Sequence, residues 1–198
     1  MDEFPPLVAR AMSLAREKGF PLSRDEADAT RPSASLPGTG RFLAILAAGC
    51  VDGRIAELGT GVGIGAAWIA SAMPAGCTLV TVELDPGLAS AARDLLAGDP
   101  RVDVVTGDAR AAVTGRGPFD LIFSDGGRLD RAELVGLLAV GGRLVMDDVT
   151  PVQALPPDSP YRDHDSKREF FFGDPRLVSV EVVLPDLRNS LLVGTRVR

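Results

Sequence analysis

From residue 54 onward, segments typical of β-strands alternate with segments typical of helices. The strand segments are short and apolar on both faces, and the helical segments place their apolar residues on one side. Strands buried on both faces and joined through helices form right-handed crossovers in a parallel sheet. The predicted strands are 54–58, 78–84, 102–106, 119–124 and 143–146, and the predicted helices are 64–73, 86–97 and about 129–138.

The C-terminal part of the chain departs from this alternation. Residues 150–165 are rich in proline and aspartate and predict a surface loop or lid, and 166–172 predicts a short helix. Two further strands, 178–184 and 191–197, are separated by a brief connection and predict an antiparallel hairpin at the sheet edge. The sequence therefore predicts a Rossmann-like α/β fold with a seven-stranded, mostly parallel sheet, a C-terminal antiparallel hairpin and helices on both faces.

The N-terminal part has helical patterns without strands. Residues 4–18 place apolar side chains on one helical face, a capping box that begins at Ser23 predicts a short second helix, and 41–48 predicts a third. We expect residues 1–36 to be a helical appendage and residues 37–198 to be the main domain.

Charge and cysteine content exclude several kinds of partner. The chain has 21 basic and 27 acidic residues, a net charge of −6, whereas nucleic-acid and anionic-membrane surfaces need clustered lysine and arginine. Its two cysteines, Cys50 and Cys77, lack the spacing of a metal site or a disulfide framework. No signal peptide or membrane-spanning apolar stretch is evident. We expect a cytoplasmic protein without nucleic-acid or membrane partners, with a homodimer left open.

Acidic residues stand at or beside the carboxyl end of each parallel strand, where ligands bind in open α/β sheets. Helix capping explains in part why an acid stands at Asp108. It does not explain the acids at Glu57, before a glycine loop, or at Glu83, inside a strand end. Such a rim suits a cationic ligand, ribose hydroxyls or a divalent metal. The acids are Glu57, Glu83, Asp108, Asp125, Asp147 and Asp148.

A glycine-rich loop, residues 57–65, follows the first strand and opens a helix. Glycines there let a ligand approach the backbone closely. Glu83 lies 20 residues beyond Gly63, where an acid can bind both hydroxyls of a ribose. The strand–turn–helix context thus predicts a nucleoside site.

Two nucleoside cofactors fit the loop spacing. Gly61, Gly63 and Ala66 satisfy the dinucleotide pattern of NAD sites. However, the charge of Glu57 would oppose a pyrophosphate at the helix N-terminus, whereas it suits the ammonium and sulfonium of S-adenosylmethionine. We favour S-adenosylmethionine. An NAD-dependent enzyme and a non-catalytic S-adenosylmethionine-binding protein stay as alternatives.

Five segments together resemble class I methyltransferases, most closely the catechol and caffeoyl-CoA O-methyltransferase type. The resemblance runs from about Pro37 to the C-terminus and implies methyl transfer from S-adenosylmethionine to an oxygen of a small molecule. The segments are ELGTGVG at 57–63, VELDP at 82–86, GDA at 107–109, FDLIFSD at 119–125 and GGRLVMDDV at 141–149.

The resemblance also implies roles for individual residues. Glu57, Gly59 and Gly61 would hold the methionine part of the cofactor, and Glu83 the ribose. Asp108 and Ala109 would flank the adenine. The remaining expected cofactor contacts are Thr60, Gly63, Leu84 and Asp125.

In this family an Asp after the fourth strand and an Asp-Asn pair after the fifth bind a divalent metal, normally Mg²⁺. The corresponding residues are Asp125, Asp147 and Asp148, so an aspartate replaces the asparagine. Such a metal would hold two acceptor oxygens and lower a hydroxyl pKa. The family's lysine is replaced by Arg128, which stays protonated and could only stabilise an alkoxide or anchor an anion. The expected catalytic residues are Asp125 and Arg128; without metal, Asp125 or Asp147 would assist deprotonation.

Overall fold

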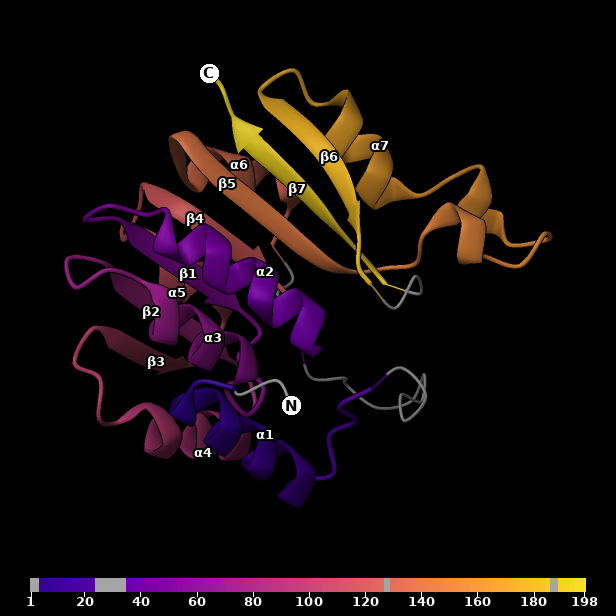
Figure 1. The fold of residues 1–198 in the computed structure, drawn as a ribbon. Helices are drawn as coiled ribbons and strands as arrows, with labels where there is room; N and C mark the ends of the chain where they lie inside the picture. Colours follow the sequence, from indigo (N-terminus) through magenta and orange to yellow (C-terminus); the bar gives the residue numbers. More distant parts are fainter. Residues whose placement is uncertain (1–3, 24–34, 127–128, 186–188) are drawn as a thin grey trace.

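A seven-stranded sheet forms the centre of the molecule in the computed structural model, which describes residues 4–23, 35–126, 129–185 and 189–198 (Figure 1). Its strand order is β3-β2-β1-β4-β5-β7-β6. Strand β7 is antiparallel to both of its neighbours and the other pairs are parallel, as predicted. The strands are β1 (Arg54–Leu58), β2 (Thr78–Glu83), β3 (Val102–Thr106), β4 (Phe119–Ser124), β5 (Leu138–Val149), β6 (Leu177–Val183) and β7 (Ser190–Arg196).

Helices cover both faces of the sheet because alternate strand residues point to opposite sides. On β1, Ile55 packs into a core with the first four helices, and Ala56 packs into a second core with the last three. The first four are α1 (Pro6–Glu17), α2 (Pro37–Ala48), α3 (Ile64–Ala72) and α4 (Pro86–Leu96). The last three are α5 (Ala109–Val113), α6 (Arg131–Leu137) and α7 (Ser166–Gly173).

The order of the strands reverses beside β1, and this reversal places the site. The chain runs outward through β1, β2 and β3, then returns to form β4 on the other side of β1. The pairing of Leu58 with both Val82 and Ser124 brings the ends of three strands level. In open α/β sheets such a switch point, at the carboxyl ends of the strands, leaves a crevice for ligands.

The structure differs from the predicted elements at several boundaries. Helix α2 begins at Pro37 rather than residue 41, because proline is well tolerated in the first turn. Strand β5 begins at Leu138, before the predicted 143–146, since Leu138 already pairs with Phe119 across an irregular register. The short helix α5 was not predicted.

Two further predictions concern the 150–165 segment and the helix expected to begin at Ser23. The 150–165 segment contains two short 3₁₀ helices, η1 (Val152–Ala154) and η2 (Pro160–Arg162), within its loop. The helix predicted to begin at Ser23 lies largely outside the described residues. Helix α1 packs against α3 and α4, and the division into an appendage and a main domain stays a prediction.

Candidate functional site

The glycine-rich loop between β1 and α3 folds tightly over the strand ends. Gly59 has φ 100° and Gly63 has φ 94°, both in the left-handed region that favours glycine. A Cβ atom on Gly59 would lie 1.8 Å from the carbonyl oxygen of Asp125 at the end of β4. The N–H groups of Gly59 and Thr60 donate to the carbonyl oxygen of Val82, at 3.0 and 3.1 Å. The loop is therefore fixed to both strands that flank β1.

Glu83, at the end of β2, is held by backbone N–H groups on both of its carboxylate oxygens. Oε2 accepts from the N–H of Gly61 at 2.8 Å, and Oε1 accepts from the N–H of Asp85 at 2.9 Å. Asp85 in turn caps α4 by accepting from the N–H of Leu88. The half-buried carboxylate keeps free lone pairs that can accept from a ligand.

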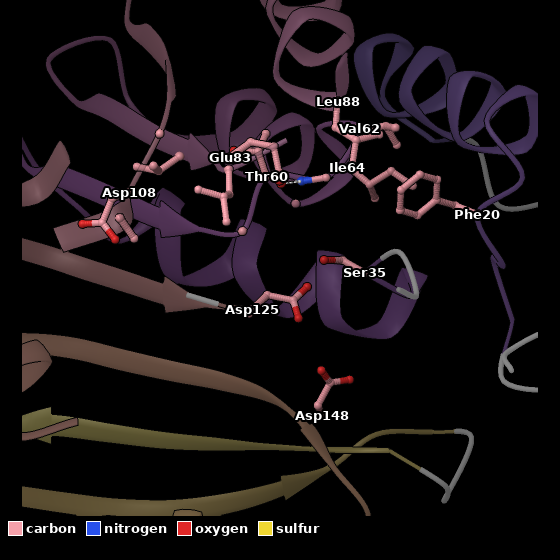
Figure 2. A pocket seen from close by; sticks show the side chains of 18 residues that line it. Phe20, Ser35, Thr60, Val62, Ile64, Glu83, Leu88, Asp108, Asp125 and Asp148 are labelled. Atoms are coloured by element: carbon pink, nitrogen blue, oxygen red, sulfur yellow. Dashed lines mark hydrogen bonds between the residues drawn. The ribbon is translucent and has the colours of Figure 1, made fainter. Parts of the chain in front are cut away.

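A cavity of about 380 Å³ opens over the glycine loop (Figure 2). In Figure 2, Asp108 lies at one end, Phe20 at the other and Glu83 between them, while Asp125, Asp148 and Ser35 lie along its lower edge. Eight of the ten predicted cofactor residues line this cavity: Gly59, Thr60, Gly61, Glu83, Leu84, Asp108, Ala109 and Asp125. The predicted residues Glu57 and Gly63 are not part of its lining.

One wall of the cavity is apolar and includes a residue from the N-terminal segment. Phe20 follows α1, and the remaining side chains of this wall are Val62, Ile64 and Leu88. No sequence signal linked Phe20 to the glycine loop, because the contact joins segments far apart in the chain. Asp108 has two roles, since it lines the cavity and caps α5 by accepting from the N–H of Ala111 at 3.0 Å.

Glu57 lies beneath the glycine loop and is 1 % exposed. Its carboxyl group accepts from the Thr81 hydroxyl and from the N–H of Ala66, and Thr81 also contacts the Thr60 hydroxyl. A Cβ atom on Gly65 would lie 2.1 Å from Glu57 Oε1, so this glycine leaves the space for the carboxyl group. Burial raises the pKa of Glu57 from 4.5 to about 8.

We expect the burial of Glu57 to make folding stability fall as pH rises from about 5 to 8. The unfolded chain ionises this carboxyl near its ordinary pKa of 4.5, whereas the folded protein keeps it protonated up to about 8. The loss is at most about 1.4 kcal/mol per pH unit. The Glu57→Gln variant should show a flatter pH dependence in urea unfolding.

The matched control for this measurement is Glu133→Gln, which removes an exposed carboxylate paired with Arg110. Its pH profile should follow that of the wild type. A Glu57→Gln profile that also parallels the wild type would contradict the assignment of a protonated Glu57.

The end of β5 directs two adjacent aspartates to different places. The pairing of β5 with β7 is irregular between Met146 and Val149, and Asp148 has φ 60°, in the left-handed region. Such an irregularity re-aims side chains at the end of a strand. Asp147 consequently points into the protein and is 7 % exposed, whereas Asp148 is exposed and lines the cavity.

Asp147 is held by hydrogen bonds on both carboxylate oxygens. Oδ1 accepts from Asn189 Nδ2 at 3.0 Å and from the N–H of Asp148 at 2.8 Å, and Oδ2 accepts from Thr39 Oγ1 at 3.1 Å. These bonds link β5 to α2 and to the residue before β7. Asp147 therefore has a structural role that its sequence position did not reveal.

Asp125, which lines the cavity, has a strongly perturbed ionisation. Burial raises the pKa of Asp125 well above its ordinary value, and the nearby charges of Asp147 and Asp148 add to this effect. The ammonium of Lys167 acts in the opposite direction. Arg128, the other predicted catalytic residue, lies outside the described residues.

The predicted metal ligands do not fit a divalent cation in this arrangement. Three donors already use the Asp147 carboxylate, and the ammonium of Lys167 donates to the carbonyl oxygens of Asp147 and Asp148 at 2.9 and 3.2 Å. Among the described residues, no three histidine, cysteine, aspartate or glutamate side chains are grouped closely enough to hold a metal. Magnesium stays a prediction of the resemblance.

A seven-stranded sheet of this order, a glycine loop after β1 and an acid at the end of β2 define the class I methyltransferase fold. Solved structures share this architecture. The O-methyltransferase TomG from Streptomyces achromogenes, in complex with SAM, superposes with a TM-score of 0.71 at 24 % identity, covering 99 % of this chain and 92 % of TomG. An O-methyltransferase from Bacillus cereus, in complex with SAH, gives a TM-score of 0.70 at 21 % identity, covering 99 % and 93 %.

Sequence comparison matches part of the chain to methyltransferases. Residues 56–149 match the family described as "Methyltransferase domain". A catechol O-methyltransferase of Niastella koreensis is 38 % identical over 108 residues, which cover 50 % of this chain and 49 % of that protein. A putative O-methyltransferase of Mycobacterium bovis is 31 % identical over 134 residues, covering 63 % and 60 %.

Residues 56–149 thus match a methyltransferase domain, and the chain has the fold of solved O-methyltransferase structures and resembles catechol O-methyltransferase in sequence. The chain spans about half of the Niastella relative and 60 % of the Mycobacterium relative. The relatives are O-methyltransferases by name and do not favour the NAD-dependent alternative.

Proposed function

We propose that the protein transfers the methyl group of S-adenosylmethionine to an oxygen atom of a small molecule. The observation that carries this proposal is the cavity over the glycine loop, with Glu83 held for ribose and acidic side chains at the opposite edge. A negative rim matches a cofactor that carries an ammonium and a sulfonium.

The cofactor would lie along the cavity with its parts matched to the lining. Both ribose hydroxyls would donate to Glu83, and the adenine would lie between Leu84, Asp108 and Ala109. The methionine part would extend over Gly59 and Gly61 toward Asp125. Glu57 would act from beneath the loop, through Thr81 and Thr60, rather than by direct contact.

The chemistry needs orientation and a proton acceptor, since the sulfonium makes the methyl group an intrinsic electrophile. A lone pair on the acceptor oxygen forms the new C–O bond while the C–S bond breaks, and the sulfur keeps that bond's electrons. The acceptor proton passes to Asp125, which borders the cofactor cavity and a second cavity of about 300 Å³. As a general base Asp125 must be ionised, and its raised pKa makes it a stronger base in that form.

Several finer points belong to the proposal. The resemblance assigns Mg²⁺ to Asp125, Asp147 and Asp148, where the ion would supply a Lewis acid. The hydrogen bonds on Asp147 favour a reaction without the metal.

Within the described residues, no helix is long and apolar enough to cross a membrane. A cytoplasmic location, a homodimer and the 1–36 appendage stay predictions.

The proposal predicts O-methylation in a turnover assay with methyl-labelled S-adenosylmethionine. The probe acceptors are catechol and its nitrogen analogue o-phenylenediamine, each assayed with and without EDTA. We expect the label on a catechol oxygen, one S-adenosylhomocysteine formed per product, and rates that EDTA leaves unchanged. Methylation of the diamine but not of catechol would contradict the proposed oxygen acceptor, and loss of turnover in EDTA would favour the metal-dependent form.

A further inference from the structure

We propose that the ammonium of Lys167 is the built-in counter-cation of the acidic strand ends and occupies the electrostatic role of a divalent metal. This inference rests on the proposed function, because it concerns the acceptor side of the same site. It assigns a function to one of only two lysines in the chain. Neither the glycine loop nor the cofactor cavity involves this residue.

Lys167 reaches the site from the first turn of α7 and lines the second cavity together with Asp125, Asp147 and Asp148. Its Nζ donates to the carbonyl oxygen of Asp147 at 2.9 Å and to that of Asp148 at 3.2 Å. These two carbonyls belong to the irregular end of β5, where Asp148 has φ 60°. The ammonium therefore bonds directly to the backbone that positions both aspartates.

The position of Lys167 is fixed by a network of hydrogen bonds around the start of α7. Asp165 caps the helix by accepting from the N–H groups of Lys167 and Arg168 at 2.9 and 3.2 Å. The Arg168 guanidinium donates to Asp165, to the carbonyl oxygen of Thr150 and to both carboxylate oxygens of Glu181 on β6. Because these bonds fix the first turn of α7, the half-buried Lys167 side chain leaves the helix in a defined direction.

Lys167 also lines the second cavity, which shares Asp125, Gly126 and Asp148 with the cavity over the glycine loop. This cavity contains the hydroxyl of Ser124, which is buried and has no hydrogen-bond partner within the described residues. Leu129 and Met146 supply apolar surface. The space thus combines two cations, four carboxyl groups and an unpartnered hydroxyl, which suits a small polar acceptor beside the methyl donor.

The Lys167 ammonium and a divalent metal ion would compete for the same position beside the carboxylates at the strand ends. Carboxylates that approach one another repel, and either a metal ion or an ammonium relieves the repulsion. Because Lys167 already binds the β5 end through two hydrogen bonds, a metal would have to enter beside a fixed positive charge. Removing that charge should expose the affinity of the acids for a hard cation.

The test is Mn²⁺ binding to the full chain without acceptor, followed by electron paramagnetic resonance of the free ion. We expect no binding to the wild type at sub-millimolar Mn²⁺. In Lys167→Met we expect affinity at least about tenfold higher, because one unit charge has been removed next to the carboxylates. Lys167→Arg keeps the charge and should behave like the wild type.

Arg131→Met is the matched control. Arg131 is a cation that lines the same cavity, but it bonds to Ser166 rather than to the end of β5. This variant should gain no Mn²⁺ affinity. If Lys167→Met does not fold, Lys167→Gln replaces it, and the wild-type titration still tests the proposal.

Tight Mn²⁺ binding by the wild type would overturn the inference, as would an equal gain in Lys167→Met and Arg131→Met or no gain in Lys167→Met. S-adenosylhomocysteine binding, measured by calorimetry on the same samples, separates this result from the proposed function. If the wild type does not bind S-adenosylhomocysteine, the proposed function is refuted. If it binds S-adenosylhomocysteine and Lys167→Met has the same Mn²⁺ affinity as the wild type, only the role of Lys167 is refuted.

Discussion

Replacing Glu83 by alanine is expected to weaken S-adenosylhomocysteine binding by about 100-fold or more. The carboxylate is already held by the N–H groups of Gly61 and Asp85, and a bound ribose would add two charge-assisted hydrogen bonds. Each such bond contributes roughly 1.5–3 kcal/mol. Isothermal titration calorimetry on wild type and variant gives the ratio of dissociation constants directly.

Two further variants make this result specific. Glu83→Gln keeps the shape of the side chain without its charge and should lie between the wild type and Glu83→Ala. Glu133→Ala removes an exposed acid paired with Arg110 and should bind normally. If Glu83→Ala bound as tightly as the wild type while remaining folded, the ribose assignment would be wrong.

The second large effect is expected for Gly59→Ala, which should lower the free energy of unfolding by about 2–5 kcal/mol. The new Cβ would lie 1.8 Å from the carbonyl oxygen of Asp125, and φ 100° strains any residue with a side chain. Relief requires the glycine loop and the end of β4 to separate, so cofactor binding should be lost as well. Urea unfolding measures the first effect and calorimetry the second.

Gly136→Ala is the control for this substitution. Gly136 lies within α6, and a Cβ there would meet no atom within 4 Å. Alanine should therefore leave stability unchanged or raise it by about 0.5–1 kcal/mol, because glycine disfavours helices. A Gly59→Ala protein as stable as the wild type would contradict the close packing of the loop against β4.

The predictable part of the fold follows from local patterns. Strands β1, β3 and β4 have the predicted boundaries, because each is a short apolar run bounded by glycine, proline or charged residues. The residues around α5 were left unassigned because five residues carry too little periodicity. The early start of β5 depends on a pair between Leu138 and Phe119, which no local pattern shows.

The site was predictable where sequence spacing determines position. The spacing of Glu83 from the glycine loop indicated its place, and the structure puts it in the cavity lining. The different directions of Asp147 and Asp148 depend on a strand irregularity, and the depth of Glu57 depends on Thr81 and Gly65 packing around it. Phe20 and Lys167 reach the site from distant segments, so only the folded chain reveals them.

The most direct test of the central claim is calorimetric titration of the wild-type protein with S-adenosylhomocysteine and, separately, with NAD, both in EDTA. We expect one S-adenosylhomocysteine site per chain, with a dissociation constant in the micromolar range or below, and no measurable heat with NAD. Binding of NAD without binding of S-adenosylhomocysteine would contradict the assignment of the cavity and, with it, the proposed methyl transfer.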